Sequence, residues 1–286
     1  MLPLSAWPLA DRRRIIGVFT DIDDTLTTKG AITSDALTAL ADLQAAGLIV
    51  IPITGRHSGW CEPLIAGHPD RCEPWPVNAI VAENGAVAFV PQPARGMRGL
   101  LSKIYQQDAR TRVGHHTRMQ AVGQRVLREV PGAVQAHDVG GRETDIAFDY
   151  NEHVHLDPVA IEQIVGIFQS EGMFTSVSSI HIHGCFDDFN KWSGACWIVR
   201  QLLQHDLSCE LDRWVFVGDS GNDQSMFQHF KHSVGVANIQ HVAAQLSHLP
   251  RYITLSERGA GFVEVAHAIL AAPPAKRKQW DGRSHL

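Results

Sequence analysis

Two aspartates, two positions apart, follow an apolar run near the start of the sequence. Residues 15–19 are rich in β-branched side chains and predict a strand buried on both faces, and Asp21 and Asp23 come just after it. In a near-extended chain both carboxylates approach one small volume, where they repel each other unless a cation or a shared proton intervenes. Mg²⁺ prefers oxygen ligands and is the simplest such cation. The alternative interpretation is an acidic turn with Thr25 starting a helix.

Polar residues also follow two later apolar runs, 48–53 and 214–217. They are Thr54, Gly55 and Arg56 after the first run, and Asp219, Asn222 and Asp223 after the second. A helix expected at 35–46, with Ser34 as its N-cap, joins the first two strands, and this strand-helix-strand order predicts a parallel sheet. Because the carboxyl ends of parallel strands meet at one edge, we expect these side chains to share a site there.

The texture of the sequence changes after residue 90. Before it, residues 77–82 and 86–90 predict two further strands. After it come helices expected at about 108–130 and 158–170, and alternating stretches at 143–150 and 175–183. Alternation with a period of two predicts strands with one solvated face, as in an antiparallel sheet.

The expected fold class is therefore α/β, with a Rossmann-like, doubly wound parallel sheet as the core and an inserted α+β cap domain. We assign residues 1–90 and 186–272 to the core and residues 91–185 to the cap. The core resumes with Lys191 and an apolar helix at 192–204, and closes with a helix at 261–271. The polar, basic segment 273–286 is expected to be a disordered tail.

The composition excludes several classes of protein. The chain has 286 residues, of which 44% are hydrophobic and 19% are charged, as in an ordinary globular protein. Its net charge of −5 does not favour binding to a nucleic acid. Five cysteines without a C-x-x-C favour neither a zinc knuckle nor a disulfide framework. The N-terminal arginines follow the apolar residues, unlike a signal peptide, and no apolar run has membrane-spanning length. We expect a cytoplasmic protein without a membrane partner; the oligomeric state is not indicated.

Four motifs in order give the chain a clear resemblance to the haloacid dehalogenase (HAD) superfamily of aspartate-nucleophile phosphatases. They are DIDDT at 21–25, ITGR at 53–56, NKWSGA at 190–195 and GDSGND at 218–223. The insert between the second and third motifs is similar to the large α/β cap of the type IIB, Cof-like branch. That branch includes sucrose-phosphate and mannosylglycerate-type phosphatases and phosphomannomutase. The resemblance covers about 15–90 and 186–265.

The resemblance implies a role for each matching residue. Asp21 is expected to attack phosphorus and form an aspartyl-phosphate, and Asp23 to act first as general acid and then as general base. The expected phosphate-binding residues are Thr54, Gly55, Lys191 and Asn222. The expected Mg²⁺ site comprises Asp21, the backbone carbonyl of Asp23, Asp219 and Asp223, the last supporting the metal or its water. The usual Gly after the acid/base residue is Asp24 in this chain.

Five residues are candidates for contact with the substrate. They are Arg56, Arg142, Glu143, His181 and His183. The two histidines lie on one face of a predicted strand and are suited to a sugar hydroxyl; the alternatives are half-exposed strand positions or, with His153 and His155, a second metal site. Arg56 contacts either the substrate or a core carboxylate. Arg142 and Glu143 follow a Gly-Gly turn that is expected to face the core.

These inferences predict a Mg²⁺-dependent phosphomonoesterase that acts on a small phosphorylated metabolite, with a sugar or glycosyl phosphate as the expected class. A cap of about 90 residues favours small substrates, because its closure must exclude water from the phosphoryl group. One alternative is a phosphosugar mutase of the same superfamily. Another is a non-catalytic regulator that binds a sugar phosphate.

Overall fold

The computed structural model of the chain describes residues 1–67, 73–92, 100–137 and 139–272. The segment 273–286, expected to be a disordered tail, lies outside the described residues. In the described part of the chain no helix combines the length and the apolar character needed to cross a membrane.

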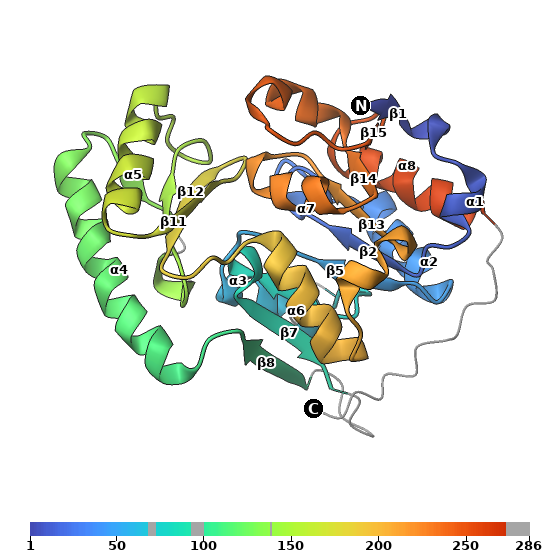
Figure 1. Cartoon of the computed structure of the whole chain (residues 1–286), viewed down its shortest axis with the longest axis horizontal. Coiled ribbons are helices and arrows are strands. Elements are labelled where there is room, and N and C mark those ends of the chain that lie inside the picture. Colours follow the sequence, from blue (N-terminus) through green and yellow to red (C-terminus); the bar gives the residue numbers. More distant parts are fainter. Residues whose placement is uncertain (68–72, 93–99, 138, 273–286) are drawn as a thin grey trace.

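A six-stranded parallel sheet forms the centre of the core, as the sequence predicts (Figure 1). Its strand order is β1-β15-β14-β13-β2-β5. The strands are β1 (Leu2–Pro3), β2 (Gly17–Thr20), β5 (Ile49–Pro52), β13 (Trp214–Gly218), β14 (His232–Gly235) and β15 (Tyr252–Ile253). The neighbouring β2 and β13 are buried at every residue, which agrees with their apolar sequences.

Helices cover both faces of this sheet, because alternate residues of its strands point to opposite sides. The helices are α1 (Leu9–Arg12), α2 (Ser34–Ala45), α6 (Lys191–Leu203), α7 (Gln224–His229) and α8 (Arg258–Leu270). Val18 packs in the hydrophobic cluster that includes residues of α2 and α8, whereas Phe19 packs in the cluster that includes residues of α6 and α7. The N-cap of α2 is Thr33 and not the expected Ser34, because the Thr33 hydroxyl accepts a hydrogen bond from the backbone N–H of Ala36.

A second, antiparallel sheet continues the core and is joined to it by a parallel bridge between Ile53 and Val81. Its strands are β6 (Ile80–Ala82), β7 (Val87–Pro91) and β8 (Leu101–Tyr105), and α3 (Ser58–Ala66) packs against it. β8 lies beyond the proposed domain boundary at residue 90 but pairs with β7. Its residues, Leu-Ser-Lys-Ile-Tyr, do not alternate apolar with polar side chains, so no strand was expected there, and all five are half-buried in the structure. A small hairpin, β3 (Thr27–Thr28) and β4 (Ala31–Ile32), follows the aspartate motif.

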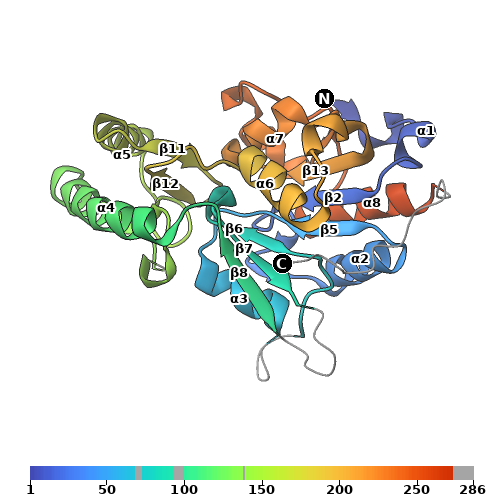
Figure 2. The ribbon, with the colours of Figure 1, turned by 60° about the horizontal axis from the view of Figure 1, so that its bottom comes forward.

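The insert contains a four-stranded antiparallel sheet of order β11-β12-β10-β9. Its elements are α4 (Ala109–Glu129), β9 (Val134–Gln135), β10 (Ile146–Asp149), α5 (Pro158–Ser170), β11 (Phe174–Val177) and β12 (His181–Cys185). In both views α4 and α5 lie on the side away from the core, and β11 and β12 lie between these helices and the core (Figures 1 and 2).

Two details of the insert differ from the sequence predictions. The alternating stretch 175–183 is not one strand but the hairpin of β11 and β12, which turns at Ser178; its hydroxyl accepts a hydrogen bond from the backbone N–H of His181. β10 and β12 also have no solvated face, since every residue in them is buried. The reason is tertiary: one face packs on α4 and α5, and the other faces the core.

Candidate active site

The carboxyl ends of β2 and β13 bring buried carboxylates around Lys191. Asn190 caps α6 through a capping box with Ser193, which places Lys191 at the first residue of the helix. Its Nζ atom lies 2.7 Å from Oδ1 of Asp21 and 2.7 Å from Oδ1 of Asp223, and the Lys191 side chain has no exposed surface. The predicted convergence of these strand ends is therefore present in the fold.

Asp219 completes a cluster of three acidic side chains. Oxygen atoms of Asp21, Asp219 and Asp223 all lie within 4.8 Å of one another. Burial raises the pKa of Asp21 to about 7, although Lys191 opposes this shift, and burial next to Asp21 and Asp223 raises the pKa of Asp219 well above its usual range. Three buried carboxylates thus face one ammonium group, and a bound divalent cation would relieve their repulsion. The donor set is all oxygen, which suits Mg²⁺.

Thr25 and Asn238 hold Asp219 in place. The Thr25 hydroxyl donates to Oδ1 of Asp219 at 3.0 Å, and the Asn238 side-chain amide donates to Oδ2 at 2.8 Å. Thr25 lies in a turn, so the alternative in which it starts a helix is wrong. Asp223 has both oxygens engaged, because Oδ2 accepts hydrogen bonds from the backbone N–H groups of Asp219 and Ser220 while Oδ1 contacts Lys191.

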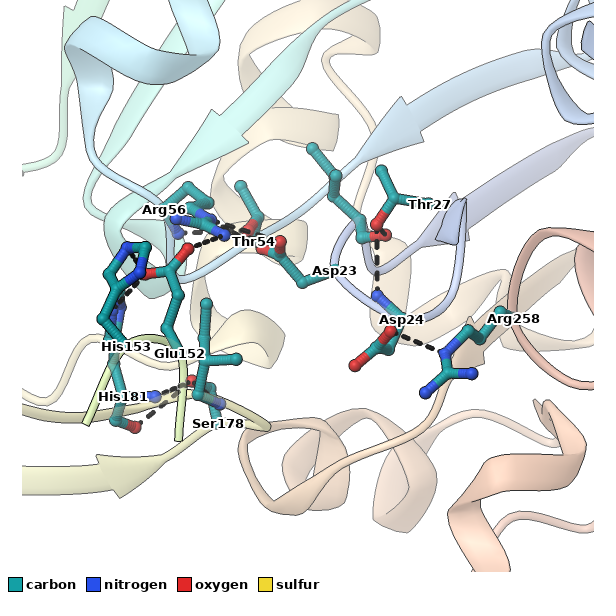
Figure 3. A network of polar contacts seen from close by, with 12 residues as sticks. Asp23, Asp24, Thr27, Thr54, Arg56, Glu152, His153, Ser178, His181 and Arg258 are labelled. Atoms are coloured by element: carbon teal, nitrogen blue, oxygen red, sulfur yellow. Dashed lines mark hydrogen bonds and ion pairs between the residues drawn. The ribbon is translucent and has the colours of Figure 1, made fainter. Parts of the chain in front are cut away.

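Asp23 is held by Arg56, so this arginine does pair with a core carboxylate, and it also lines the cavity described below (Figure 3). Arg56 Nε lies 3.0 Å from Oδ2 of Asp23, and Arg56 Nη2 lies 2.9 Å from Oδ1. The same Nη2 atom donates to Oε1 of Glu152, from the cap, at 2.8 Å. The backbone N–H of Arg56 donates to the hydroxyl of Thr54, at the end of β5.

Core and cap enclose a small cavity over these groups. It is lined by Asp21, Asp23, Thr54, Gly55, Arg56 and Asn222 from the core, and by Ser178, Ser179, Ile180, His181 and His183 from the cap. Its volume is about 10 Å³, roughly the space for one water molecule. In this conformation the space directly over Asp21 and Asp23 is too small for a phosphate ester. A larger cavity of about 360 Å³ lies beside it and shares Ser178 and Ser179 with it; Asp219 lines it from the core.

His183 lies against the core at Gly55. Its Nδ1 atom is 2.9 Å from Oδ2 of Asp145, which also accepts hydrogen bonds from Arg142, and Arg142 in turn donates to the carbonyl of Gly55. A Cβ atom on residue 55 would lie only 3.0 Å from His183 Nε2, so glycine permits this approach. His181 and His183 are 1% and 3% exposed, and the alternative that they are half-exposed strand residues is wrong.

The charge state of His183 follows from this environment. Burial lowers its pKa to about 4, although Asp145 opposes the shift, so the imidazole is neutral at pH 7. Against the effect of burial, Arg142 and His183 lower the pKa of Asp145 to about 2. The tautomer that donates from Nδ1 to the Asp145 carboxylate leaves a lone pair on Nε2. This Nε2 atom is buried and has no hydrogen-bond partner among the described residues.

Glu143 does not line the cavity. Its carboxylate accepts hydrogen bonds from Ser58, Lys103 and Tyr105, all in the core. His153 and His155 also do not meet: the group of possible metal ligands around His153 contains Asp149 and Glu152 but not His155.

Sequence reasoning missed Glu83, Asp145 and Glu152. Glu83 follows β6 as the catalytic candidates follow their strands, and this signal could have identified it. Its buried carboxylate accepts hydrogen bonds from the backbone N–H of Thr144 at 2.7 Å and of Ser58 at 3.2 Å, and so links cap and core. Asp145 and Glu152 lie in the insert, and nothing local marks them as facing the core.

Comparisons with known proteins support this description of the fold. The model of the family "Sucrose-6F-phosphate phosphohydrolase" matches residues 198–265, which include Asp219, Asn222 and Asp223. A search of the curated proteins gave no significant match.

Three solved structures cover most of the chain. A protein of Thermoplasma acidophilum has 18% identity and a TM-score of 0.63, covering 90% of this chain and 99% of its own. The sucrose-phosphatase of Synechocystis sp. PCC6803, solved with sucrose and phosphate, has 17% identity and a TM-score of 0.62, covering 90% and 98%. The HAD subclass IIB sugar phosphatase BT4131 has 15% identity and a TM-score of 0.56, covering 88% and 96%.

The matched family and two of these three neighbours are named as phosphatases. The predicted resemblance is confirmed at the level of the fold: the chain has the fold of the haloacid dehalogenase-type phosphatases.

Proposed function

We propose that the protein is a Mg²⁺-dependent phosphomonoesterase that hydrolyses a small sugar or glycosyl phosphate through an aspartyl-phosphate on Asp21. The observation that carries the proposal is the buried contact between Lys191 and Asp21, beside Asp219 and Asp223 at the carboxyl edge of the sheet. A buried carboxylate beside a fixed ammonium group suits attack on a phosphorus atom, because the ammonium offsets the charge of both the nucleophile and the phosphoryl group.

In the first step an Asp21 oxygen attacks phosphorus, the ester P–O bond breaks, and Asp23 gives its proton to the leaving oxygen. In the second step water attacks phosphorus, Asp23 takes a proton from that water, and the bond to Asp21 breaks to release phosphate. Thr54 and Asn222 line the cavity, which supports the proposal that they hold phosphoryl oxygens. Mg²⁺, held by Asp21, Asp219 and the backbone carbonyl of Asp23, would add positive charge that stabilises the transferring group.

A sugar as the leaving group is supported by His183. Its neutral Nε2 is a buried hydrogen-bond acceptor at the cavity, and a hydroxyl group is the simplest donor for it. Sucrose and phosphate were bound in one neighbouring structure, and another neighbour is a sugar phosphatase. An insert of this size over the carboxyl edge favours a small metabolite over a phosphoprotein, because its closure must exclude water from the phosphoryl group.

The test is phosphate release from sugar phosphates, glycosyl phosphates, nucleotides and 4-nitrophenyl phosphate, with Mg²⁺ or with EDTA. We expect Mg²⁺-dependent release that Asp21→Asn abolishes and that Asp42→Asn, an exposed aspartate on α2, leaves unchanged. Isomerised ester without net release would instead identify a mutase. Tight binding of a sugar phosphate without turnover would identify the regulator.

A further inference from the structure

Glu152 connects the cap to the candidate acid/base residue through a single arginine (Figure 3). Nη2 of Arg56 donates both to Oδ1 of Asp23 at 2.9 Å and to Oε1 of Glu152 at 2.8 Å. The side chains of Arg56, Asp23 and Glu152 are 12%, 15% and 23% exposed, so these charge-assisted bonds are largely shielded from water.

The cap holds Glu152 firmly in this position. Asp149, at the end of β10, accepts hydrogen bonds from the backbone N–H groups of Asn151, Glu152 and His153, which fixes the turn. The second oxygen of Glu152 lies 2.9 Å from Nε2 of His181. The hydrogen bond from His181 lowers the pKa of Glu152 to about 2, with Arg56 acting in the same direction and partial burial opposing, so the carboxylate is charged at pH 7.

The core alone holds Arg56 less completely. In the core its guanidinium group contacts the Asp23 carboxylate and the face of Trp60, whose ring centroid lies 5.1 Å from the guanidinium carbon. The space directly over Asp23 is too small for a leaving group in this conformation, so the proposal requires the cap to shift there when substrate enters, and such a shift would break the bond between Glu152 and Arg56. Return of Glu152 restores the third support of the guanidinium group.

We infer that Glu152 is a positioning residue that couples cap closure to proton transfer: by fixing Arg56 it orients the Asp23 carboxyl toward the leaving oxygen. This inference rests on the proposed function, because it assumes that Asp23 protonates the leaving group. It assigns a role in the chemistry to a cap residue that does not itself line the cavity.

The test compares two substrates that differ in their need for an acid. The alkoxide of a sugar is a strong base and leaves only with a proton, whereas 4-nitrophenolate leaves without one. The value of kcat/KM reports the steps up to the first phosphoryl transfer. For Glu152→Ala we expect it to fall roughly ten-fold for the preferred sugar phosphate and less than about two-fold for 4-nitrophenyl phosphate. Glu152→Gln, which keeps an acceptor oxygen, should give an intermediate ratio.

The ratio between the two substrates is measured on one preparation, so a partly unfolded variant does not change it. The control is Glu171→Ala, which removes a cap carboxylate paired with Arg125 far from Asp23 and should leave the ratio at the wild-type value. If kcat/KM of Glu152→Ala fell equally for both substrates, or fell for neither, the ratio would be unchanged. That result would overturn the role of Glu152 but not the proposed function. Wild-type protein that releases phosphate from neither substrate would overturn the proposed function as well.

Discussion

The ammonium group of Lys191 lies 2.7 Å from Oδ1 of Asp21, and both side chains are buried at the carboxyl edge of the sheet. Burial alone would favour the neutral amine, but Asp21 and Asp223 outweigh it and raise the pKa of Lys191 above its usual range. The lysine is therefore charged at pH 7. It balances the acidic cluster in the folded protein and, in the proposed reaction, the incoming phosphoryl group.

Replacing this charge should affect stability as well as activity. In Lys191→Met the Asp21 and Asp223 carboxylates lose their shared cation while staying buried, and we expect the free energy of unfolding to fall by about 3–5 kcal/mol. Urea unfolding with EDTA measures this change, and phosphate release should be lost. Lys231→Met, at an exposed position, is the control and should change stability little. Unchanged stability in Lys191→Met would show that the buried pair is not needed to hold the cluster.

Mg²⁺ should stabilise the folded protein through the same cluster. Binding to the folded state alone adds about 2.7 kcal/mol when the free metal is 100-fold above its dissociation constant, so Tm should rise with Mg²⁺ concentration. Asp219→Asn removes a charged oxygen donor and should abolish most of this rise, whereas the exposed Asp42→Asn should not. Equal rises in Tm for wild type and Asp219→Asn, measured by calorimetry, would place the metal elsewhere.

The part of the site that could be predicted from the sequence comprises the residues that follow the core strands. Asp21 and Asp219 each follow a fully buried strand, and parallel strands carry such residues to one edge whatever the rest of the fold does. Glu152 could not be predicted in this way, since its contact with Arg56 depends on how the cap packs against the core. The adjacent residues Arg142 and Glu143 also could not be told apart from the sequence. Arg142 donates to the carbonyl of Gly55, whereas Glu143 pairs with Lys103 of β8.

The neutral state of His183 predicts a pH dependence of stability. Its pKa is about 4 in the folded protein and about 6.5 in an unfolded chain, so the unfolded state binds more protons between these values. The contribution of His183 is therefore present above about pH 6.5 and is lost as the pH falls toward 4, by up to about 3 kcal/mol. In urea unfolding over this range, His183→Gln should lose less stability than wild type. The exposed His116→Gln should follow wild type; a parallel curve for His183→Gln would contradict the neutral assignment.

Asp24 occupies the position where the resembled family usually has glycine. The backbone conformation at this position explains why either residue can stand there. Its φ is 55°, in the left-handed region that glycine adopts freely and that aspartate tolerates better than most residues. The carboxylate gains a partner in return, because Nε of Arg258 donates to Oδ1 at 2.8 Å (Figure 3). Both side chains are about one-third exposed, so this pair contributes at most about 1 kcal/mol.

Substitutions at Asp24 should therefore rank by backbone strain. We expect Asp24→Gly to stay within about 1 kcal/mol of wild type, because relief of strain offsets the lost ion pair, and Asp24→Ala to lose roughly 1–2 kcal/mol. Urea unfolding of the same pair of variants at Asp42, an exposed residue inside α2, is the control, because a helix interior favours alanine over glycine by about 1 kcal/mol. The order of Gly and Ala should thus reverse between the two positions. Alanine ranking above glycine at both would mean that residue 24 does not hold a left-handed conformation in solution.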